Sequence, residues 1–158
     1  MCNRGRMNPY LIAVFSALFW TTIYLASKQW LPWILPRFSK WDKIRQYQGC
    51  GLIPSTAFIL VSVPLSVYVL VFDKDLYDVR KTGSTEMSMT TISIAFGYFI
   101  YDTLIILKHL KVDGFALLAH GVLCLITYGL AIEFKVFHGY GPVFLLFESS
   151  TLFVNVRW

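Results

Sequence analysis

Residues 112–129 have the sequence "VDGFALLAHGVLCLITYG", and this stretch decides the fold class. Its carboxyl and imidazole groups are confined to Asp113 and His120, and its other side chains are apolar, small or weakly polar. The hydrocarbon core of a bilayer is about 30 Å thick and requires roughly 20 mostly apolar residues per helix. The stretch therefore predicts a membrane-spanning helix that carries an imidazole.

The rest of the chain has the same character. Of its 158 residues, 56% are hydrophobic and only 15% are charged, which is too few charges for the surface of a soluble domain. We predict an all-α fold, a polytopic transmembrane helix bundle of about five spans with the last one incomplete. The predicted spans are residues 10–26, 52–72, 88–107, 115–134 and 142–158. The first lacks small residues at both cleavage positions of a signal peptide and is interpreted as an uncleaved anchor.

The basic residues do not indicate a nucleic-acid partner. The net charge is +5, but lysine and arginine lie in short connectors and form no continuous basic face, so contact with anionic lipid headgroups is the simpler interpretation. Residues 28–46 combine tryptophans, prolines and cations and are predicted to lie at a membrane interface. The cysteines, Cys2, Cys50 and Cys124, have no metal-ligand spacing, and we expect no metal site and no cofactor.

Two prolines fall in the second span. Pro54 suits its opening turn, whereas Pro64 lies inside and frees a backbone carbonyl. Neighbouring groups or a Ser/Thr hydroxyl are expected to satisfy this carbonyl, and Ser62 and Ser66 are nearby candidates.

Ionisable groups inside a membrane are costly and indicate a functional site. Asp102 precedes the connector after the third span by about five residues, and His120 follows it by about five, so both are expected about 8 Å below the same interface. Helical spacing places Asn155 at that depth and Glu148 nearer the other leaflet. Purely structural roles remain open, such as a pair between Asp102 and Lys108, or a core histidine bonded to one neighbour.

Three segments resemble the TLC domain family, which includes ceramide synthases, translocon-associated membrane proteins and lipid-linked TLC domain proteins. They are "GYFIYDTLIIL" at 97–107, "KVDGFALLAHG" at 111–121 and "GYGPVFLLFESSTLFVNVRW" at 139–158. The last is most similar to the small TLC domain proteins. The resemblance implies a partial TLC-like domain over residues 37–158, preceded by an anchor helix and interfacial segment over 1–36. It also implies further spans after residue 158, as in a truncated chain.

Ceramide synthases carry an aspartate and, seven residues later, an adjacent pair of histidines. By this resemblance Asp113 matches the aspartate and His120 the first histidine, but Gly121 replaces the second. A glycine cannot transfer a proton, and His109 lies too near the connector to substitute. The resemblance therefore favours a protein without catalysis; in an enzyme, His120 would be the base, oriented by Asp113 or Asp102.

We thus expect an integral protein of the endoplasmic reticulum or another internal membrane that binds, senses or helps to regulate membrane lipids, as in lipid homeostasis. The alternatives are an acyl-CoA-dependent N-acyltransferase acting on a sphingolipid precursor, and an assembly factor for another membrane protein. Membrane lipids are the expected partners, with homo- or hetero-oligomers open and no nucleic acid. The predicted polar core or lipid site consists of Asp102, His120, Glu148, Asn155, Tyr98 and Tyr101.

Overall fold

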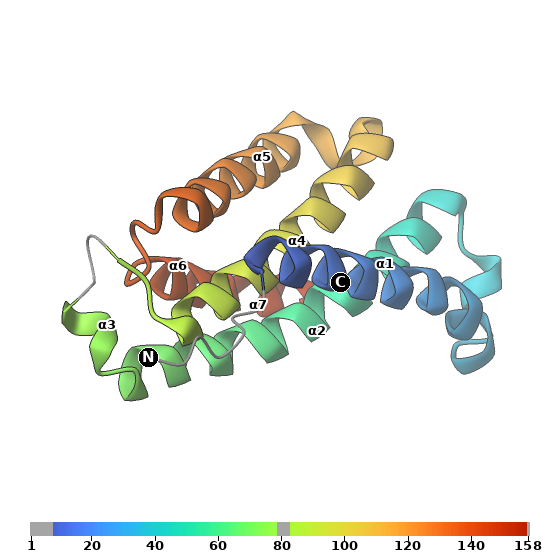
Figure 1. Ribbon diagram of the computed structural model, residues 1–158. Helices are drawn as coiled ribbons and strands as arrows, with labels where there is room; N and C mark the ends of the chain where they lie inside the picture. Colours follow the sequence, from blue (N-terminus) through green and yellow to red (C-terminus); the bar gives the residue numbers. More distant parts are fainter. Residues whose placement is uncertain (1–7, 79–82, 158) are drawn as a thin grey trace.

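The computed structural model describes residues 8–78 and 83–157, so Cys2 and Trp158 lie outside it. The described part is helical and contains no strand, which confirms the all-α prediction (Figure 1). Four helices are long and apolar enough to cross a membrane, and the apolar stretch Gly141–Val156 is shorter. The elements are α1 (Pro9–Ile34), η1 (Phe38–Lys40), α2 (Lys43–Phe72), α3 (Asp75–Asp78), α4 (Glu86–Lys108), α5 (Leu110–Phe134), α6 (Gly141–Phe147) and α7 (Ser149–Arg157).

The first two helices extend beyond the predicted spans. Helix α1 continues to Ile34, and α2 begins at Lys43 rather than at Leu52. The Asp42 side chain caps the start of α2 by accepting a hydrogen bond from the Arg45 backbone N–H. Apolar composition finds only the part of a helix that suits hydrocarbon, whereas capping groups fix its ends. Much of residues 28–46 is therefore helix.

The prolines of α2 differ from their prediction. Pro54 lies inside the helix and does not open it, because the helix begins eleven residues earlier, at Lys43. The hydroxyls of Ser62 and Ser66 are buried and have no hydrogen-bond partner among the described residues, so neither satisfies the carbonyl freed by Pro64. These two candidates were wrong.

Helix α4 is the centre of the bundle. It packs against α1, α2, α5 and α6, and it contributes the largest share of buried residues (Figure 1). An aromatic cluster fills the space around it. The Tyr98 ring stacks on Phe58 of α2 at 3.7 Å between centroids, and Phe99 stacks on Tyr128 of α5 at 5.4 Å. Trp20 of α1 meets Phe58 and Tyr98 edge to face, so four helices share one aromatic core.

The chain returns from α5 to α6 through a buried histidine. His138 is 0% exposed, and its Nε2 lies 2.9 Å from the Ala131 carbonyl oxygen while its Nδ1 lies 3.1 Å from the Ser88 hydroxyl. Ser88 also forms a capping box with Thr85 at the start of α4. His138 thus attaches the α5–α6 connector to α4 and fixes where α6 begins.

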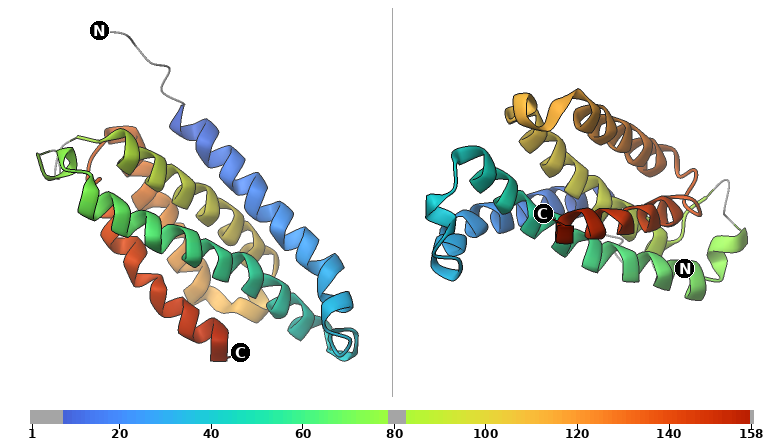
Figure 2. Two further views of the ribbon diagram at one scale, coloured as in Figure 1. Left: turned by 90° about the horizontal axis from the view of Figure 1, so that it is seen from below. Right: turned by 180° about the vertical axis from the view of Figure 1, so that it is seen from behind.

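The last helical segment is broken in two. Helix α6 ends at Phe147 and α7 begins at Ser149, and both pack on α2; Figure 2 shows α7 running alongside α2. The predicted straight span over 142–158 is therefore two shorter helices. Glu148 lies between α6 and α7 with helical backbone angles, φ −63° and ψ −16°, and lines the cavity described below.

Candidate functional site

A cavity of about 370 Å³ lies between α2, α4, α5 and α7. All six residues of the predicted polar core line it, and Asp113 lines it as well. Its side chains that carry a polar group are Tyr47, Gln48, Ser55, Tyr98, Tyr101, Asp102, Asp113, His120, Glu148, Thr151 and Asn155. Phe58, Phe99, Ile105 and Leu117 supply apolar wall. The structure therefore brings the predicted residues together around one space.

His120 lies beside Glu148. Its Nε2 is 3.6 Å from Glu148 Oε1 and 3.6 Å from the Cys124 sulfur, and about half of its side chain is exposed. The expectation that Glu148 lies nearer the other leaflet than His120 was wrong, because the two side chains lie within 3.6 Å of each other. At 3.6 Å the two groups are within ion-pair reach but beyond a normal hydrogen bond.

Asp102 lines the same cavity without a partner. Its carboxyl forms no hydrogen bond or ion pair with any residue that the structure describes, so the alternative of a pair with Lys108 is not observed. Neither Asp102 nor Asp113 forms a hydrogen bond or ion pair with His120. The acidic neighbour of His120 is Glu148. The cavity thus holds a carboxyl that is available to a ligand.

Asp113 is held at the start of α5. It accepts a hydrogen bond from the Tyr47 hydroxyl of α2. The next residue, Gly114, has φ +80°, a conformation that residues with a side chain rarely adopt, and it interrupts the helix. The continuous part of α5 therefore begins at Phe115, where the fourth span was predicted to begin.

Asn155 attaches α7 to α2. Its Nδ2 donates to the hydroxyls of Ser55 at 3.0 Å and Thr56 at 3.1 Å. Tyr98 and Tyr101 are buried in the aromatic core, at 6% and 4% exposure. These three residues shape the cavity wall, which leaves Asp102, His120 and Glu148 as the ionisable groups without a short hydrogen bond.

Gly121 does not face the cavity. It is buried against α4, where a Cβ atom would lie 2.6 Å from the Thr103 Oγ1, so any larger residue here requires the Thr103 side chain or the helices to shift. A histidine at this position would not fit the present helix packing.

The described residues contain no group of three His, Cys, Asp or Glu side chains that could hold a metal ion. The cavity instead combines three carboxyls and an imidazole with apolar wall. Such a lining suits an amphiphile whose polar end donates hydrogen bonds.

Comparison with known proteins identifies the family. The family profile of the TLC domain matches residues 52–158, about two thirds of the chain. The chain belongs to the TLC domain family. The resemblance noted in the sequence is thereby confirmed, and the match covers the cavity helices from Leu52 onward.

Two curated TLC domain proteins are similar over most of this chain. TLC domain-containing protein 4 of Homo sapiens is 29% identical over 145 residues, which is 91% of this chain and 54% of that protein. An uncharacterised TLC domain-containing protein of Schizosaccharomyces pombe is 20% identical over 147 residues, or 93% of this chain and 50% of that protein. The chain therefore spans about half the length of these relatives. No solved structure gives a significant match.

Proposed function

We propose that this TLC domain protein binds a membrane lipid in the cavity between α2, α4, α5 and α7, without catalysing a reaction on it. The observation that carries the proposal is the carboxyl of Asp102, which lines the cavity without a partner among the described residues. A carboxyl that is largely removed from water and has no protein partner needs a hydrogen-bond donor. A lipid whose headgroup carries an amine or hydroxyl supplies one.

Two observations support the absence of catalysis. The position of the second histidine of ceramide synthases is Gly121, which packs on Thr103 outside the cavity. His120 has a single acidic neighbour, at 3.6 Å, and no second imidazole lines the cavity. Resemblance to ceramide synthases favours an internal membrane such as the endoplasmic reticulum, and a role in lipid homeostasis.

The test measures lipid that co-purifies with the protein. The full chain is purified in mild detergent, and its lipids are extracted and quantified by mass spectrometry. We expect the Asp102→Asn/His120→Gln variant to lose at least half of one lipid class relative to wild type. Glu133→Gln is the matched control, because Glu133 is an exposed carboxyl of α5 outside the cavity. Equal lipid content in a folded double variant and wild type would refute the proposal.

The His120–Glu148 pair favours a second candidate, an acyltransferase that uses acyl-CoA. The amine nitrogen of the substrate attacks the thioester carbonyl of acyl-CoA, and an imidazole beside a carboxylate can take the proton that the amine loses. The amide forms as the carbon–sulfur bond breaks, and CoA leaves as the thiol. The assay supplies acyl-CoA and a sphingoid base to the purified protein. Amide product that disappears in His120→Ala and falls in Glu148→Gln would establish this activity, and product no greater than in His120→Ala would exclude it.

A further inference from the structure

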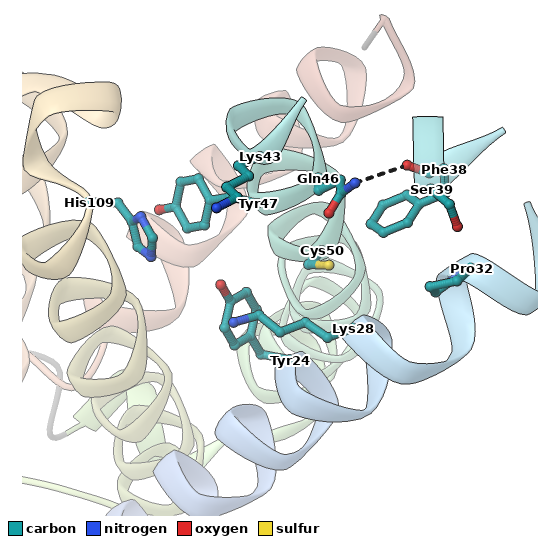
Figure 3. A pocket seen from close by; sticks show the side chains of 10 residues that line it. All are labelled: Tyr24, Lys28, Pro32, Phe38, Ser39, Lys43, Gln46, Tyr47, Cys50 and His109. Atoms are coloured by element: carbon teal, nitrogen blue, oxygen red, sulfur yellow. Dashed lines mark hydrogen bonds between the residues drawn. The ribbon is translucent and has the colours of Figure 1, made fainter. Parts of the chain in front are cut away.

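A second cavity, of about 480 Å³, lies where the α1–α2 and α4–α5 connectors meet (Figure 3). Its lining comes from α1, η1, α2 and the residue between α4 and α5. The lining residues are Tyr24, Lys28, Pro32, Phe38, Ser39, Lys43, Gln46, Tyr47, Cys50 and His109. The ring of Tyr47 lines this cavity and the first one, so it forms part of the wall between them.

The lining is basic and contains no carboxyl group. Neither Lys28 nor Lys43 forms an ion pair with a residue that the structure describes; the Lys28 Nζ lies 4.3 Å from the centroid of the Tyr24 ring. The two nearest acidic side chains are engaged elsewhere. Asp113 accepts a hydrogen bond from the Tyr47 hydroxyl, and Asp42 caps the start of α2. The cavity lining therefore carries two lysines without an ion pair among the described residues, and the nearby Asp113 carboxylate lies outside the lining.

A buried hydroxyl also lacks a partner at this cavity. Tyr24 is 2% exposed, and its hydroxyl oxygen has no hydrogen-bond partner among the described residues. Figure 3 shows the hydroxyl turned toward the side of the cavity where Tyr47 and His109 lie. A buried polar group without a partner is unfavourable, so an acceptor atom of a ligand would be stabilised there.

His109 adds a neutral donor. Its ring stacks on Tyr47 at 3.8 Å between centroids. Burial, together with the positive charges of Lys108 and Lys28, lowers the pKa of His109 below its ordinary value, while Asp113 acts in the opposite direction. At neutral pH the ring is uncharged and retains one N–H, which can donate to an anion.

We propose that this cavity binds a phosphate group, held by Lys28, Lys43, the Tyr24 hydroxyl and the His109 N–H. A phosphate has several acceptor oxygens and negative charge, which match two ammonium groups and two neutral donors that converge from three parts of the chain. The exposed Trp30 and Trp33, at 66% and 88%, belong to the adjacent turn of α1 and suit the headgroup level of a membrane. The phosphate belongs to a phospholipid headgroup or to a soluble phosphate compound.

The experiment titrates the purified full chain with two probes, short-chain phosphatidic acid and inorganic pyrophosphate, and counts bound ligand by native mass spectrometry. We expect Lys28→Gln/Lys43→Gln to weaken binding at least about tenfold, because hydrogen bonds to charged groups are lost. Lys40→Gln/Lys111→Gln removes the same charge from exposed positions near the same connectors, outside the cavity lining. This control should change the affinity by less than about twofold.

Tyr24→Phe is the second variant, since it removes one oxygen and keeps the ring in the core. We expect it to weaken binding by about threefold or more, which is readable even if the double variant fails to fold. If the variants lose affinity only for phosphatidic acid, the site is assigned to a lipid headgroup. If they lose affinity for pyrophosphate to the same degree, the site is assigned to soluble phosphates. Binding of neither probe to wild type, or equal weakening in the lysine control, would overturn the proposal.

Discussion

Gly121 illustrates how one residue has both a sequence interpretation and a structural one. By resemblance it is the place where a catalytic histidine is missing. In the fold it is a contact between α4 and α5, where a Cβ atom would lie 2.6 Å from the Thr103 Oγ1. The Thr103 hydroxyl is itself buried without a partner among the described residues. The glycine therefore has a packing reason that is independent of catalysis.

This contact predicts a coupled pair of substitutions. Gly121→Ala should lower the free energy of unfolding by about 1–3 kcal/mol through overpacking. Thr103→Ala removes the obstructing oxygen, so the double variant should recover much of that loss. Thermal unfolding in detergent of the two single variants and the double variant measures the coupling. Strictly additive effects would contradict the assigned contact.

His138 is the residue for which the fold predicts pH dependence. Burial lowers its pKa below the ordinary 6.5, and the positive charge of Lys135 acts in the same direction, while the hydrogen bond to Ala131 opposes them. Below about pH 6.5 the unfolded chain therefore binds more protons at His138 than the folded one. The contribution of neutral His138 to the free energy of unfolding is fully present above that pH and is lost as the pH falls further.

We expect wild type to unfold at a lower temperature at about pH 5.5 than at about pH 7.5. His138→Gln should show a smaller difference, because an amide keeps a donor and an acceptor but does not titrate in this range. The comparison isolates His138 from His109, whose pKa is also lowered. An identical pH dependence in both proteins would show that His138 does not contribute.

At the scale of elements, α1 is held to α4 by close approach. The Ser16 hydroxyl donates to the Ile94 carbonyl at 2.8 Å and accepts from the Trp20 indole N–H at 3.0 Å. A Cβ atom on Gly97 would overlap the Ala13 carbonyl oxygen and lie 2.6 Å from the Ser16 Cβ. This seam of small residues lets the two backbones pack side by side.

Gly97→Ala should therefore destabilise the bundle by about 1–3 kcal/mol or separate α1 from α4. Gly51→Ala is the control, because a Cβ there meets no atom within 4 Å. Thermal unfolding measures the destabilisation, and the yield of a cysteine crosslink between α1 and α4 measures their separation. A Gly97→Ala protein as stable as the control would show that the seam is not tight.

The sequence predicted the helices better than their ends. Apolar runs located α4 and α5 closely, because the span boundaries there coincide with the Thr85–Ser88 capping box and the Gly114 break. The extension of α1 and α2 was missed because polar and aromatic residues continue these helices past the apolar part. No proline or glycine at Glu148 predicts the one-residue interruption between α6 and α7.

At the scale of the whole molecule, depth along the helices predicted that Asp102 and His120 share one level, and they line one cavity. The neighbour of His120, Glu148, was not predictable, because its place depends on how α7 lies on α2 through Asn155. The basic cavity was also missed. Its two cations, Lys28 and Lys43, belong to separate helices, and each alone resembles an ordinary interfacial residue.

The central claim is that a lipid occupies the cavity between α2, α4, α5 and α7. Gly51 lines this cavity, and a Cβ atom built there meets no atom within 4 Å, so Gly51→Leu adds apolar volume at the cavity without removing charge. A leucine also favours a helix over glycine by about 1 kcal/mol. The exposed Val61→Leu on the same helix is the control.

The decisive measurement is the number of lipid molecules that co-purify with each protein, determined by quantitative mass spectrometry alongside its unfolding temperature. We predict that Gly51→Leu is at least as stable as wild type and carries less than about half of its lipid. The control should carry the wild-type amount. A stable Gly51→Leu protein with undiminished lipid would contradict the account.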